Sequence, residues 1–280
     1  MYILLFGAHG RLGTAIERVL PQHTYASPTK DELDLTDEIA VRAFVLGHPA
    51  DFMVNCAAYN NVDGAETNVE LANRINGEVP GVLATIAYEQ GVPFLHFSTD
   101  YVFDGKKREP YTEDDVPNPQ SAYAQSKLLG ETNVLKNNSD SYVVRTSRLY
   151  GPPGREEGSK RSFVEIVLEL ASTKPEFDIN PLETASPTFV DDLARHLDAH
   201  IFSEDLKPGL YHMTNTGGCT WLEWAQAIVE ITGLPSQVKP RQTAFVRAAS
   251  IPAYSVLTSV RAPLMRGWRE ALKDYLLTSP

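Results

Sequence analysis

A glycine-rich turn separates a short apolar run from a helical pattern at the start of this chain. The apolar run Tyr2–Phe6 is followed by GAHGRLG, which places Gly7, Gly10 and Gly13 in GxxGxxG spacing. Glycine permits a sharp bend and lets backbone N–H groups approach a pyrophosphate, while the third glycine lets the helix lie close to the strand. The N-terminus of the helix adds a partial positive charge. The turn therefore predicts a dinucleotide-binding site, and an ordinary tight turn is the alternative.

The first half of the chain alternates short apolar runs with longer helical patterns. The runs YILLFG, DFMVNCA, VPFLHFS and SYVVRTS are separated by stretches with apolar residues at three- and four-residue spacing. This alternation predicts an α/β fold with a Rossmann-type doubly wound parallel sheet over residues 1–150.

The pattern changes after Tyr150. GPPGREEGSK, residues 151–160, is typical of a flexible charged loop, and shorter helical patterns separated by Pro and Gly follow it. We expect a smaller, mostly helical substrate-binding lobe over residues 151–280. Some of its segments, for example around 186–204, could return to the first domain.

Composition excludes several classes of partner. The net charge is −11 and no run of Lys or Arg interrupts it, so nucleic acid is not an expected partner. The apolar run Tyr2–Phe6 is too short for a signal peptide or a membrane span, so no membrane association is expected. The only cysteines, Cys56 and Cys219, do not form a CxxC pair, which favours a reduced cytoplasmic setting.

Tyr123 and Lys127, in SAYAQSKLLGE, form the strongest catalytic signal. Four residues make about one helical turn, so both side chains project from one face. We expect the lysine to lower the pKa of the phenol and make it a usable acid at neutral pH. Thr99 stands where a strand should end, and its hydroxyl would orient the same carbonyl oxygen. Asp100 is either a substrate hydrogen-bond acceptor or a cap on the following turn.

The ribose end of the predicted cofactor site is less sharply defined. A site selective for NAD usually has an acidic residue at the end of the second strand. Here Ser27, Thr29 and Lys30 come first and could accept a ribose phosphate, which favours NADPH and leaves NADH open. The alternative for Lys30 is a solvated surface charge.

Longer strings resemble the dTDP-4-dehydrorhamnose reductase family of extended short-chain dehydrogenase/reductases. They are NCAAYNNVDGAE, FSTDYVFDG, PYTEDDVPNPQSAYAQSKLLGE, VVRTSRLYG and SPTFVDDLA, and they span most of the chain. The resemblance implies NADPH-dependent reduction of the C4 keto group of dTDP-4-dehydro-L-rhamnose in dTDP-rhamnose biosynthesis. A nucleotide sugar is then the expected substrate, and a homodimer is an open alternative to a monomer.

The resemblance also assigns roles by position. Gly10, Arg11 and Leu12 would hold the pyrophosphate, and Asp34 and Leu35 would lie at the adenine. Lys127 would bind the nicotinamide ribose as well as tune the phenol. The candidate cofactor residues are Gly7, Gly10, Arg11, Leu12, Gly13, Lys30, Asp34, Leu35, Ala57, Ala58, Tyr59 and Lys127, and the candidate substrate residues are Thr99, Asp100, Tyr123 and Arg148.

Three positions depart from the family pattern, all on the substrate side. Arg148 replaces a sugar-contacting tryptophan, and Ile251 and Thr258 stand where arginine and aspartate are usual. Arg148, Arg241 or Arg247 could replace the missing arginine as a phosphate partner. A reductase of another nucleotide-linked 4-keto-deoxysugar therefore stays open as a function.

The remaining expectations concern metals and other classes of function. Some family members hold magnesium at a dimer contact, but Ala15 occupies the position of one expected acid and no HExxH, EF-hand or Cys/His ligand set occurs, so no required metal is expected. A regulatory homologue resembling the beta subunit of methionine adenosyltransferase is one alternative, and a nucleotide-sugar epimerase or dehydratase is another. The presence of Thr99, Tyr123 and Lys127 favours catalysis over regulation.

Overall fold

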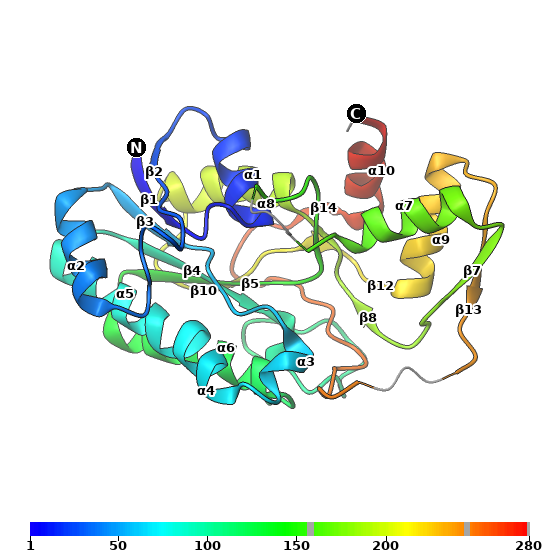
Figure 1. Cartoon of the computed structure of the whole chain (residues 1–280), viewed down its shortest axis with the longest axis horizontal. Coiled ribbons are helices and arrows are strands. Elements are labelled where there is room, and N and C mark those ends of the chain that lie inside the picture. The colour runs from blue at the N-terminus through cyan, green and yellow to red at the C-terminus, as the bar shows by residue number, and fades with distance from the viewer. Residues whose placement is uncertain (156–159, 244–246, 279–280) are drawn as a thin grey trace.

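The computed structural model describes residues 1–155, 160–243 and 247–278. Within them, a central sheet carries helices on both faces, and a smaller group of helices and short strands lies beside it (Figure 1). Residues 156–159, in the charged loop predicted over 151–160, lie outside the described residues.

The central sheet has six strands in the order β10-β5-β4-β3-β1-β2. Each neighbouring pair runs parallel. The inner strands are buried almost without interruption, because helices cover both faces and leave no solvent-facing side to alternate. This arrangement confirms the predicted Rossmann-type α/β fold. The strands are β1 Tyr2–Phe6, β2 Thr24–Ala26, β3 Phe52–Asn55, β4 Phe94–Thr99, β5 Ser141–Thr146 and β10 Gly209–His212.

Helices pack on the sheet in two layers, each with its own hydrophobic core. The helices α1 and α8 bury apolar residues on one face, and α2, α5 and α6 bury theirs on the other (Figure 1). Because α8 and β10 follow residue 150, the later chain returns to the sheet; the domain boundary at residue 150 itself stays a prediction. The helices are α1 Arg11–Val19, α2 Glu38–Gly47, α5 Val79–Gln90, α6 Ala122–Asn137 and α8 Val190–Leu197.

A separate hydrophobic core holds the smaller lobe together. Trp224 is almost fully buried there, and the ring of Tyr150 packs edge-on against it at a centroid distance of 5.4 Å. Two of the helices begin with capping boxes, Ser162 with Glu165 and Thr220 with Glu223, which satisfy their first backbone N–H groups. The lobe is built from α7 Phe163–Thr173, α9 Trp221–Thr232 and α10 Trp268–Thr278 with the parallel pair β7 Glu176–Ile179 and β13 Gln237–Pro240.

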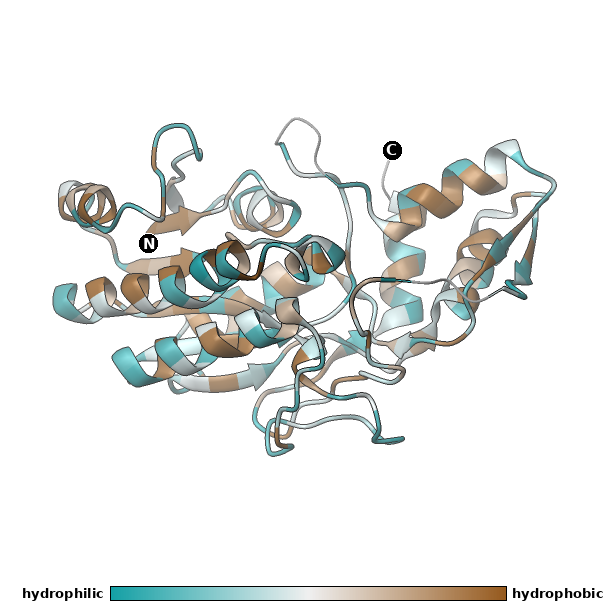
Figure 2. Cartoon of the chain, turned by 60° about the horizontal axis from the view of Figure 1, so that its bottom comes forward, coloured by the Kyte–Doolittle hydropathy of each residue, from teal (hydrophilic) through white to brown (hydrophobic). Residues whose placement is uncertain are grey.

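Short elements complete the described chain. Figure 2 shows largely hydrophobic strands in the sheet and helices that carry both hydrophobic and hydrophilic residues, as expected for helices with one buried side. The short elements are α3 Val62–Ala65, α4 Val69–Asn73, η1 Arg74–Glu78, η2 Asp100–Val102, η3 Asp198–Phe202, β6 Leu149–Tyr150, β8 Thr184–Ala185, β9 Thr188–Phe189, β11 Asn215–Thr216, β12 Cys219–Thr220 and β14 Met265–Gly267.

Candidate active site

A cavity of about 490 Å³ opens at the carboxyl ends of the parallel strands. Its walls come from the segments that follow β1, β3, β4 and β5, from the start of α6, and from Phe163, Trp221 and Trp224 of the smaller lobe. The carboxyl ends of the strands are where open α/β sheets bind ligands. Gly7, Thr99, Tyr123, Lys127 and Arg148 all line this one cavity, although the sequence separates them widely.

The glycine turn has the shape that a dinucleotide phosphate requires. Gly7 has a φ of +75°, and a Cβ placed there would lie 2.5 Å from the backbone nitrogen of Ala57. A Cβ on Gly13 would lie 2.5 Å from the Cα of Ala8, so only glycine allows α1 to approach the strand this closely. Gly10, at the N-cap of α1, has no capping side chain, and the first turn contains no acidic residue. The N–H groups at this end of α1 therefore suit a pyrophosphate.

We expect Gly7→Ala to weaken both the fold and cofactor binding. The new methyl group would collide with the backbone of Ala57 in a left-handed conformation, and such strain costs about 1–3 kcal/mol. Chemical denaturation and titration with a nicotinamide cofactor measure the two effects. Gly47→Ala is the matched control, because a Cβ there meets nothing within 4 Å. Equal stability and cofactor affinity in both variants would contradict this account of the turn.

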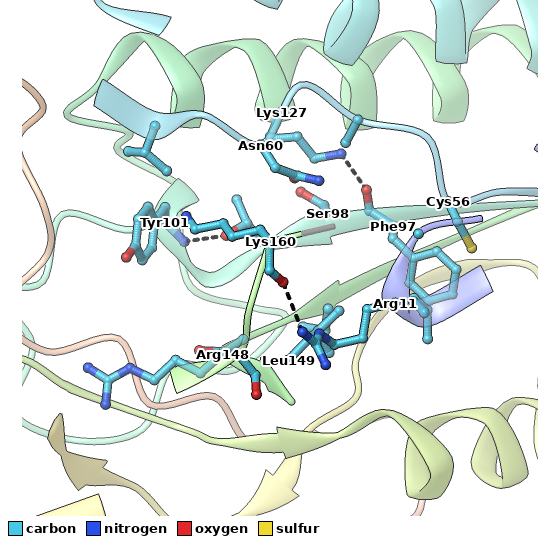
Figure 3. Close-up of a pocket in the computed structure, with 18 of the residues that line it drawn as sticks. Arg11, Cys56, Asn60, Phe97, Ser98, Tyr101, Lys127, Arg148, Leu149 and Lys160 are labelled. Atoms are coloured by element: carbon cyan, nitrogen blue, oxygen red, sulfur yellow. Dashed lines mark hydrogen bonds between the residues drawn. The ribbon is translucent and has the colours of Figure 1, made fainter. Parts of the chain in front are cut away.

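Arg11 contributes to the cavity differently from its predicted role. Its guanidinium donates to the carbonyl oxygens of Pro152 at 3.0 Å and Lys160 at 2.9 Å and to the Glu165 carboxylate at 2.9 Å. Figure 3 shows the contact with Lys160. The side chain therefore ties the start of the smaller lobe to the glycine turn. The backbone of Arg11 remains available for the predicted pyrophosphate contact, because the residue begins α1 beside Gly10.

Tyr123 and Lys127 lie in the first two turns of α6, as the spacing predicted. The Ser121 side chain caps this helix by accepting a hydrogen bond from the backbone N–H of Ala124. Thr99 is the last residue of β4, also as predicted. Its hydroxyl accepts from the backbone N–H of Tyr101 at 3.2 Å.

The predicted effect of Lys127 on the phenol is not what the structure has. The pKa of Tyr123 is raised to about 12, because burial and then the nearby Asp100 carboxylate disfavour the phenolate and a hydrogen bond with Thr99 only partly opposes them. The Lys127 Nζ instead donates to the Phe97 carbonyl oxygen at 2.6 Å (Figure 3). The phenol thus keeps its proton at neutral pH, which suits a proton donor.

Burial lowers the pKa of Lys127 to about 8, against the opposing influence of Glu131 and Cys56. The lysine is 3 % exposed, so solvent offers its ammonium group little stabilisation. Lys127 therefore changes charge close to neutral pH, whereas Tyr123 keeps its proton there.

Asp100 is held inside the site by two hydroxyl donors. The Ser255 Oγ donates to its Oδ2 at 2.5 Å, and the Thr99 Oγ1 donates to its Oδ1 at 3.2 Å. Burial raises the pKa of this carboxyl group, which is 2 % exposed. The cap of the following turn η2 is Thr99 and not Asp100, so the capping alternative is wrong for Asp100. Its contact with substrate stays a prediction.

Arg148 is fixed by the smaller lobe before any ligand arrives. Its guanidinium donates to the carbonyl oxygens of Cys219 at 2.8 Å and Glu183 at 2.9 Å. The same group lies 3.8 Å from the centroid of the Trp221 ring, and the indole N–H of Trp221 donates to the Glu183 carboxylate at 2.8 Å. Arg148 and Trp221 together line the cavity, so an aromatic surface is present beside the position where the family has tryptophan.

The comparisons with known proteins agree with this geometry. The family model described as the RmlD substrate binding domain matches residues 1–279. A dTDP-4-dehydrorhamnose reductase of Mycolicibacterium smegmatis is 36% identical over 97% of this chain and 84% of its own length. The chain belongs to the dTDP-4-dehydrorhamnose reductase family. It is therefore an oxidoreductase that uses a nicotinamide cofactor, which decides against the purely regulatory hypothesis.

Two further relatives of this chain bear on its cofactor and its substrate. A crystal structure of dTDP-4-dehydrorhamnose reductase from Bacillus anthracis in complex with NADP has a TM-score of 0.92 and 31% identity, and covers 99% of both chains. A probable dTDP-4,6-dihydroxy-2-methyloxan-3-one 4-ketoreductase of Streptomyces antibioticus is 38% identical over 97% of this chain and 93% of its own length. The family thus contains more than one named ketoreductase.

The predicted cofactor residues outside the glycine turn and α6 are distributed unevenly around the cavity of this reductase. Leu12, Ala57 and Ala58 line the cavity. The remaining predicted residues do not: Lys30 and Asp34 are exposed, Leu35 packs against a hydrophobic core, and the N–H of Tyr59 donates to Asn76 Oδ1 at 2.7 Å. The hydroxyls expected to accept a ribose phosphate already donate to carboxylates, Ser27 to Glu17 and Thr29 to Glu32.

The other departures from the family pattern lie away from the cavity lining. Thr258 donates its N–H to the Tyr111 carbonyl oxygen at 2.9 Å, and Ile251 is half-buried. Arg247 pairs with Asp63 at 3.0 Å, so it joins the C-terminal segment to α3. These contacts show what the substituted segment does for the fold; which arginine meets the substrate phosphates stays a prediction.

Sequence reasoning missed the contribution of the smaller lobe to the cavity. Phe163, Trp221 and Trp224 line it, but in the sequence they only mark helical patterns. Several buried polar atoms of lining residues, among them Thr146 Oγ1 and Trp224 Nε1, have no hydrogen-bond partner in the described part of the chain. The available sequence signal for this contribution was that all three aromatic residues stand in the first turn of a helix, α7 or α9.

Neither a metal cluster nor a membrane-spanning helix occurs in the parts of the chain that the structure describes. There, no three or more His, Cys, Asp or Glu side chains gather in a way that could hold a metal ion. Nor does any helix in residues 1–155, 160–243 and 247–278 have the length and apolar character needed to cross a membrane. The expectation that no metal is required stays a prediction.

Proposed function

We propose that this enzyme reduces the C4 keto group of dTDP-4-dehydro-L-rhamnose to give dTDP-L-rhamnose, with NADPH as the reductant. The observation that carries the proposal is the single cavity in which the glycine turn meets Thr99, Tyr123 and Lys127. In this proposal residues 1–150 bind the cofactor and residues 151–280 hold the sugar, apart from α8 and β10, which complete the sheet.

Each catalytic side chain has a distinct task in the proposed reaction. The nicotinamide cofactor supplies the hydride to the carbonyl carbon. Tyr123 donates its phenol proton to the oxygen, and the Thr99 hydroxyl turns from Asp100 to donate a hydrogen bond that orients the same oxygen. Lys127, which stands one helical turn after Tyr123, stabilises as an ammonium group the phenolate that forms during turnover, although burial and Asp100 keep the pKa of the resting phenol high. Asp100 accepts a hydrogen bond from a sugar hydroxyl.

NADPH is preferred in this proposal for two reasons. The crystal structure from Bacillus anthracis, 31% identical, contains NADP. The chain also has Ser27, Thr29 and Lys30 after β2, where an NAD-selective site has an acid. A ribose phosphate would have to compete with Glu17 and Glu32 for the two hydroxyls. Initial rates with NADPH and NADH at equal concentrations test the preference, and faster turnover with NADH would overturn it.

A second substrate, another nucleotide-linked 4-keto-deoxysugar, is favoured by Arg148. Its guanidinium presents a charged plane over Trp221 in the cavity, and one relative is named for a different 4-ketoreduction. Kinetics with a panel of dTDP-, GDP- and UDP-linked ketosugars separate the two candidates. A higher kcat/KM for any donor other than dTDP-4-dehydro-L-rhamnose would replace the first proposal with the second.

We expect Arg148→Lys to raise the KM for the nucleotide sugar about tenfold and to leave the affinity for the cofactor unchanged. Lysine cannot span the Cys219 and Glu183 carbonyl oxygens or stack on Trp221, and one lost charged hydrogen bond is worth about 1.5–3 kcal/mol. Steady-state kinetics and cofactor titration provide the two measurements. Arg195→Lys, on an exposed side chain of α8, is the control. An unchanged KM would show that Arg148 serves the fold alone.

A homodimer stays an open alternative to a monomer. Sedimentation or light scattering of the purified enzyme at several concentrations distinguishes the two.

A further inference from the structure

A buried polar cluster lies beside Lys127 at the wall of the cavity, where Asn55 and Lys127 are lining residues and His96 lies behind them. It consists of Asn55 at the end of β3, His96 in β4 and Lys127 in α6. The Lys127 Nζ is 3.4 Å from the His96 Nε2, and the His96 Nδ1 is 3.2 Å from the Asn55 Nδ2. His96 has no exposed surface and Asn55 is 1 % exposed. The reaction proposed above uses neither Asn55 nor His96.

The backbone fixes which way the Asn55 amide points. The N–H of Ala57 donates to the Asn55 Oδ1 at 3.0 Å, so this atom is the oxygen and the amide nitrogen must face His96. An amide nitrogen can only donate, so the His96 Nδ1 accepts. Burial and the neighbouring Lys127 hold the pKa of His96 well below its ordinary value, so the ring is neutral. A neutral ring that accepts at Nδ1 carries its proton at Nε2.

This tautomer turns a donor toward Lys127. An ammonium group has three donors and no lone pair, whereas an amine has a lone pair that can accept the Nε2–H of His96. Either form can donate to the Phe97 carbonyl oxygen at 2.6 Å. The contact with His96 therefore favours the amine and disfavours the ammonium.

The other groups around Lys127 do not remove this effect. The Glu131 carboxylate, one turn along α6, favours the ammonium, but it already accepts hydrogen bonds from Arg145 and Ser98. Cys56, after β3, is a neutral thiol because burial raises its pKa. Tyr123, one turn before Lys127 on α6, is a neutral phenol at neutral pH. His96, whose Nε2 lies 3.4 Å from the Lys127 Nζ, is a donor in this tautomer.

We propose that His96 is a positioning residue whose tautomer, fixed by Asn55, favours the amine form of Lys127 and sets the pH at which the lysine stops supporting Tyr123. This inference rests on the proposed reduction, in which the ammonium form stabilises the phenolate. It assigns to Asn55 and His96 a role that acts through Lys127.

The proposal predicts the shape of the pH profile. Lys127, with a pKa of about 8, is an ammonium below that pH and an amine above it. Activity should therefore be constant on the acid side of this value and fall on the alkaline side. Loss of the Tyr123 proton is expected only at higher pH, because burial raises the pKa of the phenol to about 12. The alkaline limb of the kcat/KM profile therefore reports the loss of the proton from Lys127.

Asn55→Asp removes the donor to His96 and also adds a local negative charge that favours the ammonium, so its result is interpreted together with His96→Gln and nitrogen NMR of the ring. The carboxylate still accepts from Ala57 but can no longer donate to His96, so the ring proton should move to Nδ1 and Nε2 should accept from the ammonium. We expect the alkaline limb of kcat/KM to move up by about one pH unit or more, which corresponds to at least a tenfold change in the ionisation constant. Asn137→Asp, at the exposed end of α6, is the charge-matched control and should keep the wild-type limb.

His96→Gln is the conservative variant. Glutamine can accept from Asn55 through its oxygen and donate toward Lys127 through its nitrogen, so we expect the wild-type limb to be retained. Two results would overturn the proposal. One is an alkaline limb of kcat/KM that does not shift in a folded Asn55→Asp variant, and the other is the complete loss of that limb in His96→Gln.

Nitrogen NMR of the imidazole rings supplies a readout that needs neither substrate nor a variant of Asn55. The wild-type enzyme should show His96 protonated at Nε2, with the His96→Gln spectrum identifying its signal among the seven histidines. A proton at Nδ1 would overturn the inference even if Asn55→Asp does not fold. Absence of sugar turnover alongside an Nε2–H signal would instead overturn the proposed function and leave the tautomer established.

Discussion

Tyr123→Phe is expected to lower kcat/KM by about 10²–10⁴-fold, the usual contribution of a positioned general acid. Phenylalanine keeps the ring that packs edge-on against Tyr101 at 6.1 Å but cannot donate a proton to the carbonyl oxygen. The raised pKa of Tyr123, about 12, means that the wild-type phenol holds its proton throughout the working pH range. Affinity for the cofactor and the free energy of unfolding should both stay close to wild type.

Initial rates of the two proteins, with cofactor titration and chemical denaturation beside them, measure this prediction. Tyr88→Phe is the matched control, because the Tyr88 ring is 60% exposed on the surface. A folded Tyr123→Phe enzyme with a kcat/KM within a few-fold of wild type would assign the proton to another group.

Glu131→Ala should have the largest effect on stability, about 3–5 kcal/mol, because it leaves Arg145 as a buried charge without its partner. The two side chains are 4% and 3% exposed and are joined by hydrogen bonds of 2.8 and 2.6 Å. Glu131 lies on α6 one turn beyond Lys127, so the pair also holds the catalytic helix against β5. Urea denaturation of variant and wild type measures the loss.

Two comparisons isolate the buried charge as the cause. Glu131→Leu combined with Arg145→Met should be markedly more stable than Glu131→Ala, since it removes both charges and fills the space with apolar groups. Glu169→Ala should change stability by less than about 1 kcal/mol, because its pair with Arg161 is more than half exposed. A small loss of stability in Glu131→Ala would contradict this account and would mean that water reaches the Arg145 guanidinium.

The fold and the cofactor half of the site could be predicted from sequence because their signals are local. The glycine turn, the strand end at Thr99 and the Tyr123–Lys127 spacing each lie within a few residues. Local geometry also fixes the carboxyl ends of parallel strands at one edge of the sheet, so these segments had to meet in one cavity.

The substrate half depends on long-range packing, which no local pattern contains. Trp221 reaches the cavity because α9 packs in the core of the smaller lobe, and Arg148 turns toward it because carbonyl oxygens of Glu183 and Cys219 hold its guanidinium. The sequence placed Lys127 correctly on the face of Tyr123. It could not predict that the Phe97 carbonyl oxygen would take the lysine's strongest hydrogen bond, since that contact joins α6 to β4.

We propose that one cavity binds a reduced nicotinamide and a nucleotide ketosugar, and that the ketosugar receives there a hydride from the nicotinamide and a proton from Tyr123. The most direct test follows the absorbance of reduced nicotinamide while purified enzyme, NADPH and enzymatically generated dTDP-4-dehydro-L-rhamnose are mixed, with Tyr123→Phe in parallel. We predict oxidation of NADPH by the wild type that is almost absent in the variant. A folded wild-type enzyme that binds NADPH and leaves it unoxidised would contradict the proposed substrate, and equal oxidation by both proteins would contradict the proposed proton donor.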